Sequence, residues 1–200
     1  LFAQGSPEAT SKGDSVYVAY HEGGMIKSLE TYRNDKRNGI SVQISTKGDV
    51  ISETYYKGGL QNGVVKKYRA HGEVMEEGEF LNGKVHGVYK KYYENDIIQE
   101  EANYKNGKKE GTTTWFFQNG NPVTEFNYED GELTGEAKTY YKTGAIKTLF
   151  LYKNNKRQGV YKSFYENGKV NVVGEYKRGE KSGKWIHYDE AGVEVKKESY

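Results

Sequence analysis

Aromatic rings and lysines that recur at fixed spacing are the side chains of this sequence best suited to chemistry. Six rings follow one another every 24 residues: Tyr68, Tyr92, Phe116, Tyr140, Phe164 and Tyr188. Four lysines each precede one of these rings by two residues: Lys66, Lys90, Lys138 and Lys162. Together they form an aromatic–lysine stripe, which could stack on nucleobases, sugars or lipid headgroups. The same side chains would also stabilise a one-layer sheet, with the lysine stems covering the rings.

Catalytic and metal-binding groups show no comparable order. The four histidines occupy different positions of the pattern and form no column: His21, His71, His86 and His187. Adjacent acids such as Glu76 and Glu77 point to opposite faces of a strand, so one strand cannot join them as an acid–base pair. The Gly-x-x-x-Gly turns lack the Gly-Lys-Ser/Thr ending of a phosphate-binding loop. We therefore predict no catalytic residue, no metal site and no cofactor, and a protein that is not an enzyme.

The composition favours a thin β structure. Of the 200 residues, 34% are hydrophobic, 19 are Tyr and 25 are Gly. This is too little aliphatic surface for a thick core, and too many rings for a disordered chain. The net charge is only +2, and acidic residues are interleaved with the basic ones, which argues against a nucleic-acid partner. The absence of Cys excludes disulfides and thiolate chemistry.

The first four residues bear on localisation. Leu1-Phe2-Ala3-Gln4 has the apolar-to-small pattern that ends a secretory signal. This pattern predicts an exported protein, whether periplasmic, outer-membrane-associated or extracellular. If these residues are merely a boundary of the sequence, a cytoplasmic location stays open. No run reaches the roughly 18 consecutive apolar residues that a membrane-spanning helix needs.

A strict period of 24 residues organises the chain. One column is glycine throughout: Gly39, Gly63, Gly87, Gly111, Gly135, Gly159 and Gly183. Another is aromatic throughout: Tyr32, Tyr56, Phe80, Tyr104, Tyr128, Tyr152, Tyr176 and Tyr200. Self-similarity at a fixed period is the signature of a repeat architecture. We predict eight tandem units over residues 15–200, preceded by a flexible leader at residues 1–14.

Each unit has the pattern of one β-hairpin. Asn167-Gly168 lies between two β-rich runs, and Asn-Gly favours a two-residue turn in which both residues take positive φ. The units are joined by a second connection, for which residues 105–111 are typical. Its two glycines are four residues apart and flanked by Asn and Lys, which predicts a longer, solvated reversal.

A register set by two-residue turns sorts the side chains onto two faces of a sheet. It pairs Lys66 with Glu77, and Tyr161 with Gly174, which suits cross-strand neighbours. One face carries the columns of Tyr161, Tyr165, Val170, Gly174 and Tyr176, and the other carries those of Lys162, Phe164, Asn171 and Val173. We expect the first face to be buried because it is the more apolar. The predicted fold class is all-β: an elongated single-layer antiparallel sheet of tandem 24-residue β-hairpin repeats.

The last predicted strand, residues 193–200, ends in phase with no capping segment. An open edge invites strand addition by a partner or by a second copy, which would form a homodimer. Lys196, Lys197 and Glu198 are the kind of residues that discourage such pairing. The sequence leaves both interpretations open.

Three runs of residues carry a resemblance to a known family. They are Tyr104-Lys-Asn-Gly-Lys-Lys-Glu-Gly111, Tyr152-Lys-Asn-Asn-Lys-Arg-Gln-Gly159 and Phe164-Tyr165-Glu166-Asn167-Gly168. The pattern resembles the MORN repeat in its bacterial variant, over nearly the whole chain. The resemblance implies an antiparallel hairpin strip that engages membranes or proteins, and some bacterial members resemble the antitoxins of toxin–antitoxin pairs. The repeat itself brings no catalytic residues.

These features predict a non-enzymatic repeat scaffold that mediates protein–protein interaction. Its rings would anchor the partner, and its Lys/Glu pairs would fix the register. An antitoxin-like role, in which the strip sequesters a toxin, belongs to this prediction. The alternative is membrane-surface phospholipid or glycan binding through the aromatic–lysine stripe. A second alternative is a structural spacer without a partner.

Overall fold

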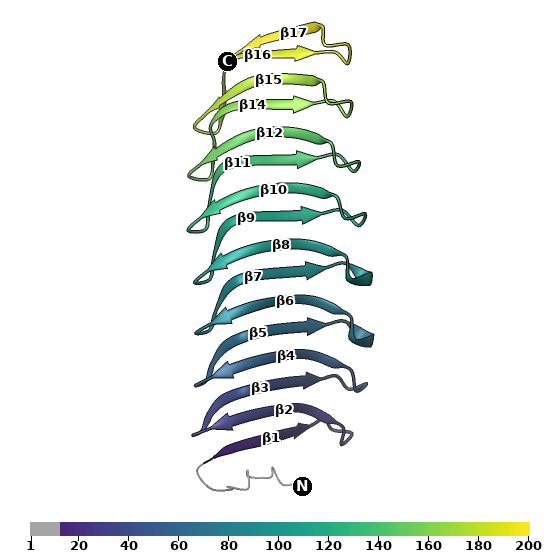
Figure 1. Cartoon of the computed structure of the whole chain (residues 1–200), viewed down its shortest axis with the longest axis vertical. Helices are drawn as coiled ribbons and strands as arrows, with labels where there is room; N and C mark the ends of the chain where they lie inside the picture. Colours follow the sequence, from purple (N-terminus) through teal and green to yellow (C-terminus); the bar gives the residue numbers. More distant parts are fainter. Residues whose placement is uncertain (1–12) are drawn as a thin grey trace. The chain divides into compact units, whose positions relative to one another are not determined.

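The computed structural model describes residues 13–200 and divides into two units, Leu1–Asp96 and Ile97–Tyr200. Each unit is a meander of antiparallel strands joined by short turns (Figure 1). The prediction of an all-β fold made of antiparallel hairpins is confirmed. The signal-like residues 1–4, and the leader as far as residue 12, lie outside the described residues.

The first unit contains seven strands, each antiparallel to the next. They are β1 (Asp14–Tyr20), β2 (Ile26–Arg33), β3 (Lys36–Ile44), β4 (Val50–Lys57), β5 (Leu60–Tyr68), β6 (Val74–Leu81) and β7 (Lys84–Tyr92). Two single-turn 3-10 segments, η1 (Ala70–Gly72) and η2 (Glu94–Asp96), lie in its turns. Strand β1 begins one residue inside the expected leader, because Asp14 pairs with Arg33 of β2.

The second unit contains ten strands in the same arrangement. They are β8 (Ile98–Lys105), β9 (Lys108–Phe116), β10 (Pro122–Glu129), β11 (Glu132–Tyr140), β12 (Ile146–Lys153), β13 (Lys156–Arg157), β14 (Gly159–Phe164), β15 (Val170–Lys177), β16 (Glu180–Tyr188) and β17 (Glu194–Ser199). Strands β13 and β14 both pair with β12 and are separated only by Gln158. No α-helix occurs among residues 13–200.

The two kinds of turn are the reverse of those predicted. The connection in residues 105–108 is the tight one: Asn106 and Gly107 take φ values of 52° and 87°, and Lys105 pairs directly with Lys108. A two-residue hairpin turn of this type is defined by positive φ at both of its central residues. The longer reversal expected here was therefore wrong. The second glycine of the motif, Gly111 with φ 71°, lies instead in the strand beside a register shift, where a bulge needs this conformation.

The turn at Asn167-Gly168 has a three-residue loop, not the two-residue loop expected. The amide of Tyr165 donates to the carbonyl of Lys169 (2.8 Å), and Gly168 alone takes positive φ (83°). Asn167 uses its side chain instead, because its Oδ1 accepts the amide of Lys169 (2.9 Å). A loop of this kind adds a bulge to the following strand.

This bulge corrects the predicted faces near the turn. Phe164 pairs with Val170, and the register shifts between Ser163 and Phe164. Val170 therefore lies on the same face as Phe164. The prediction that it shares the face of Tyr161 was wrong. Away from the turns the predicted register is confirmed: Lys66 pairs with Glu77, and Tyr161 pairs with Gly174.

Within each unit, one face of the sheet holds all the buried side chains, and we call it the packed face. It carries the column of Val65 in the first unit and that of Tyr161 in the second. The buried residues on it are Ser28, Glu30, Ser41, Thr54, Val65 and Gly78 in the first unit, and Glu100, Ala102, Thr113, Ala137, Phe150, Ser163, Gly174 and Trp185 in the second. The expectation that this face is the buried one is confirmed.

The packed face places large rings on small residues. A Cβ atom on Gly174 would overlap the ring of Trp185, and one on Gly78 would overlap the ring of Tyr89. The rings also contact one another: the centroid of Trp185 lies 5.3 Å from that of Tyr161 and 5.2 Å from that of Tyr176. Because a single layer has no second sheet to cover it, these rings supply the apolar burial that a core normally provides.

Candidate interaction surface

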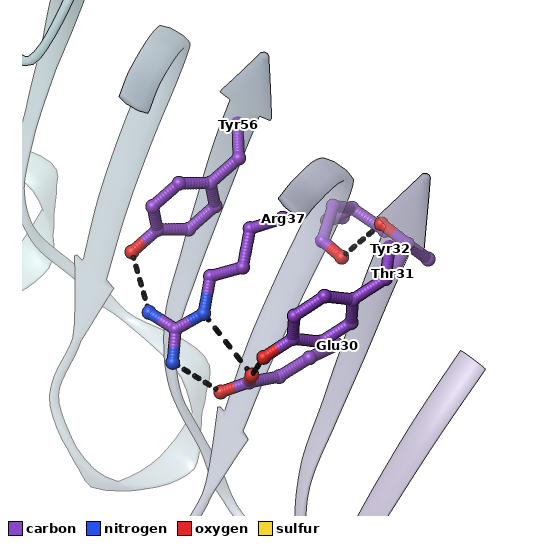
Figure 2. Close-up of polar contacts among 6 residues, drawn as sticks. Glu30, Thr31, Tyr32, Arg37 and Tyr56 are labelled. Carbon is purple, nitrogen blue, oxygen red and sulfur yellow. Dashed lines mark hydrogen bonds and ion pairs between the residues drawn. The ribbon is translucent and has the colours of Figure 1, made fainter. Parts of the chain in front are cut away.

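Charged groups on the packed face serve the sheet itself. Glu30 is only 8% exposed, and its carboxylate accepts two hydrogen bonds from Arg37 (2.9 and 3.1 Å) and one from the Tyr32 hydroxyl (2.7 Å). Figure 2 shows the Arg37 guanidinium between Glu30 and the hydroxyl of Tyr56, which lies 3.4 Å away. A buried carboxylate is tolerated only when it is paired and hydrogen-bonded in this way.

Cations in the same column as Arg37 cover rings elsewhere on the packed face. In the second unit, Lys109 lies 4.6 Å from the centroid of Trp115, and Lys181 lies 4.5 Å from that of Trp185. Arg157 lies 5.0 Å from the centroid of Phe150. Sequence reasoning missed this set, although its signal was present: these cations recur at multiples of 24 residues. These cations therefore stabilise the rings of their own sheet.

The opposite side of each sheet, which we call the open face, carries the aromatic–lysine stripe. All ten predicted residues lie on it in strands and are half-buried: Tyr68, Tyr92, Lys66 and Lys90 in the first unit, and Phe116, Tyr140, Phe164, Tyr188, Lys138 and Lys162 in the second. One pair of columns on the open face contributes several strongly exposed apolar side chains. They are Tyr55, Val64 and Val88 in the first unit, and Leu151 and Val160 in the second.

In the first unit, carboxylates of the sheet form hydrogen bonds and an ion pair with the polar groups of the stripe. The hydroxyl of Tyr68 donates to Glu53 (3.1 Å), and that of Tyr92 donates to Glu77 (2.6 Å). Burial, and then the neighbouring Glu53, raises the pKa of Tyr68 to about 12. Lys66 lies between Glu53 and Glu77 on the adjacent strands, and its Nζ is 3.6 Å from Glu77. The charges of the stripe are thus balanced within this unit.

In the second unit the stripe changes along the sheet. Tyr140 donates to Glu125 (2.7 Å), and Lys138 forms an ion pair with Glu136 (2.6 Å). The pKa of Lys138 is raised, first by its hydrogen bond to Glu136. Phe116 and Phe164 have no hydroxyl to donate. Rings and lysines at equivalent positions therefore present different chemistry.

The open face of the first unit is hollowed between β4 and β7. One depression has a volume of 430 Å³ and is lined by Glu53, Tyr55, Asn62, Gly63, Val64 and Lys66. Val64 separates it from a second depression of 260 Å³, which Glu77, Gly78, Glu79, Val88 and Lys90 complete. Both are shallow and mix apolar walls with charges, as protein-binding surfaces do.

The described part of the chain contains neither a candidate metal site nor a candidate membrane-spanning helix. No group of three or more His, Asp or Glu side chains there could hold a metal ion. Two of the histidines already have other partners: His21 bonds the carbonyl of Ile44 (2.9 Å), and His187 contacts Glu198 (3.1 Å). Residues 13–200 also contain no helix long and apolar enough to cross a membrane.

Side chains at one turn position clamp several hairpins to the hairpin that follows. Tyr141 donates to the carbonyl of Phe164, and Tyr165 donates to that of Tyr188, both at 2.8 Å and across 23 residues. In the first unit Arg69 makes the same connection to the carbonyl of Tyr92 (2.5 Å). His21 makes the equivalent contact with the carbonyl of Ile44. Tyrosine, arginine and histidine can all form this clamp, because it needs only an N–H or O–H group that reaches the neighbouring turn.

We expect Tyr165→Phe to lower the free energy of unfolding by about 1 kcal/mol, because the Tyr188 carbonyl loses its donor while the ring stays in place. The measurement is the urea midpoint of the full chain. Phe117 occupies the same column naturally, so the substitution should not disturb the backbone. Phe117→Tyr serves as the reciprocal control. An unchanged midpoint for Tyr165→Phe would show that the clamp contributes nothing.

Three side chains contact one carboxylate of the last strand, β17, and one of them, His187, lies on the neighbouring strand β16. Glu198 contacts Lys196 (2.6 Å), His187 (3.1 Å) and the hydroxyl of Tyr200 (3.3 Å). Hydrogen bonds from Lys196 and then His187 lower the pKa of Glu198 from 4.5 to about 2. Partner capture at this edge, and its discouragement by charged residues, both stay predictions.

Acid should release β17 before the strands beside it. Because the folded-state pKa of Glu198 is depressed, its contribution is present above pH 4.5 and disappears as the pH falls through about 2. The NMR cross-peaks of amides in β17 should move toward random-coil positions over this range, while those of β15 stay in place. Glu198→Gln should remove this pH dependence. A transition of β17 that persists in this variant would contradict the assignment.

Consecutive antiparallel hairpins with a constant period define a β-hairpin repeat protein. A family model described as "MORN repeat variant" matches four successive segments, residues 85–106, 109–130, 133–154 and 157–178. Their starting points are 24 residues apart, as the columns require. Residues 85–178 of the chain therefore consist of four MORN repeats of the variant type. The family consists of non-catalytic repeats that generally mediate contacts with proteins or membranes.

Other comparisons add little to this assignment. No curated protein matches the chain. Among solved structures, a mutant of S. aureus TarM in complex with Fondaparinux, alpha-GlcNAc-glycerol and UDP is 15% identical, with a TM-score of 0.28 over 64% of this chain and 22% of that one. The TcdB2-TccC3-Cdc42 structure is 12% identical, with a TM-score of 0.25 over 93% of this chain and 12% of that one. The chain thus spans less than a quarter of each of these proteins, and neither likeness carries an argument.

Proposed function

We propose that this chain is a non-enzymatic scaffold that binds a partner protein through its open face. The observation that carries the proposal is the difference in exposure between the two faces of the sheet. The buried side chains lie on the packed face, whereas the open face keeps exposed apolar groups such as Val64 and Val160 beside charged ones. Apolar groups interleaved with charges are typical of a protein-binding surface, in which the charges fix the register of the partner.

A protein partner suits the charges of the first unit better than an anionic membrane does. Each lysine near an anionic bilayer gains only about 1 kcal/mol. The carboxylates of Glu53 and Glu77 flank Lys66 and would be repelled by the same surface. The membrane and glycan alternatives are therefore secondary. An antitoxin-like role is one specific form of the proposal, in which the bound protein is a toxin.

Photo-crosslinking in the cells that make the protein tests the proposal. A photoreactive phenylalanine analogue replaces Val64 or Val160 on the open face, and Glu190 in an exposed turn as the matched control. The open-face positions should each give a discrete protein adduct that the turn position does not give. Adducts that form only with lipid, or adducts with a glycan, would favour the alternatives. The absence of any adduct at either position would indicate a structural spacer.

A further inference from the structure

The open face of the second unit carries an aliphatic patch around a single lysine. The patch consists of Leu149, Leu151, Val160, Val173 and Ile186, with Lys162 among them. Leu151 is 42% exposed and Val160 is 52% exposed. These are side chains that a solvent-facing sheet surface rarely gathers without a use. The patch lies on strands β12 to β16 and is separate from the depressions of the first unit.

Lys162 differs from the other lysines of its column in what lies beside it. Its direct neighbours on β12 and β15 are Leu149 and Val173. Within residues 13–200 no carboxylate lies within ion-pair distance of its ammonium group. The burial of its stem is intermediate, so the charge stands in a largely aliphatic setting.

The same column shows what is missing. Lys66 of the first unit lies between two glutamates, Glu53 and Glu77. Lys138 of the second unit has Glu125 on one neighbouring strand and forms an ion pair with Glu136. Lys66 and Lys138 thus each have a carboxylate beside them, whereas Lys162, at the equivalent position, has none within ion-pair distance. An anion provided by a binding partner would complete the pattern.

We propose that the aliphatic patch binds a segment of the partner protein that presents one carboxylate between apolar side chains. This inference rests on the proposed function and names the chemistry of its partner. The apolar side chains would cover Leu151 and Val160, and the carboxylate would meet the Lys162 ammonium group. Burying that contact removes water from both charges and strengthens their attraction. A carboxylate at this point also fixes the register of the segment, which a purely aliphatic contact cannot do.

Charge favours a protein segment over an anionic bilayer here as well. The net charge is one positive unit for Lys162 together with the charged side chains that pair directly with patch residues, which are Glu136, Lys138, Glu175 and Lys197. Binding to anionic lipid usually requires a cluster of several cations. One ammonium group within an apolar surface is instead complementary to one carboxylate within an apolar segment.

The test uses the full chain and a displayed library of random peptides. Immobilised protein selects peptides, with counter-selection against Lys162→Glu, and the enriched peptides are synthesised with their acidic residue as Glu or as Gln. The Glu form should bind at least about tenfold more tightly than the Gln form. Lys162→Met keeps the aliphatic stem and should abolish this preference. Lys66→Met, the matched variant of the first unit with carboxylate neighbours, should keep it. Thermal unfolding of each variant confirms that it is folded.

The outcomes separate this inference from the proposed function. Selected peptides that lack an acidic residue, or that bind Lys162→Met as tightly as the original protein, overturn the inference. If their binding depends on Tyr55 or Lys66, the proposed scaffold survives and only its location changes. If neither peptides nor cellular adducts are found, both fail. Co-sedimentation with phosphatidylserine vesicles that is lost in Lys162→Glu would overturn the inference in favour of a lipid surface.

Discussion

Replacing Trp185 by alanine should lower the free energy of unfolding by about 3–5 kcal/mol, the largest loss we expect from one substitution. The ring is 2% exposed, lies on Gly174 and contacts Tyr161 and Tyr176 through its faces and edges. In a one-layer sheet no second layer can move in to fill the space. Urea unfolding of the full chain, followed by circular dichroism, measures the loss.

A second substitution makes this prediction specific to the contact with Gly174. Gly174→Ala alone should destabilise the protein by about 1–3 kcal/mol, because its methyl group overlaps the ring. In the Trp185→Ala background the same methyl group enters the vacated space and should cost little or nothing. Additive effects of the two substitutions would show that the ring does not rest on Gly174.

Replacing Arg37 by methionine should lower the free energy of unfolding by about 2–3 kcal/mol. Within residues 13–200, the change leaves the carboxylate of Glu30, which is 8% exposed, with the hydroxyl of Tyr32 as its only side-chain hydrogen-bond donor. We expect less than for a fully buried pair because the Arg37 side chain is 41% exposed and screened by water. The measurement is again the urea midpoint.

Two further variants test whether the unpaired carboxylate causes the loss. Adding Glu30→Leu to Arg37→Met removes both charges and should restore most of the stability. Arg33→Met breaks an ion pair with Asp14 in which both side chains are more than half exposed, so it should change the midpoint little. The interpretation fails if the double variant is no more stable than Arg37→Met alone.

Much of the fold follows from spacing along the chain. Columns at a constant period identify the hairpins, and alternation within a strand assigns Tyr161 and Gly174 to the packed face. The turn types did not follow, because Asn-Gly occurs in both kinds of turn. In one kind Asn106 takes positive φ, whereas in the other Asn167 instead caps the amide of Lys169 with its side chain. Loop length depends on how the flanking strands pair, which the dipeptide alone does not specify.

The candidate site shows the same limit. The stripe was predictable because its rings and lysines repeat, but its chemistry depends on the neighbouring strands. Glu53 and Glu77 neutralise Lys66, whereas Leu149 and Val173 leave Lys162 without a carboxylate. These neighbours are separated from each lysine by a turn whose bulge shifts the register. The predicted register already paired Lys66 with Glu77, whereas the partners on the other neighbouring strand, such as Glu53 and Leu149, had to be read from the structure.

The amino-acid sequence by itself determined the period, the hairpin repeat and the face that packs, because these depend on spacing within single strands. Only the tertiary structure decided the turn geometry, the Glu30–Arg37 cluster and the isolation of Lys162. Each of these depends on which atoms of adjacent strands come together, and small shifts in register change that.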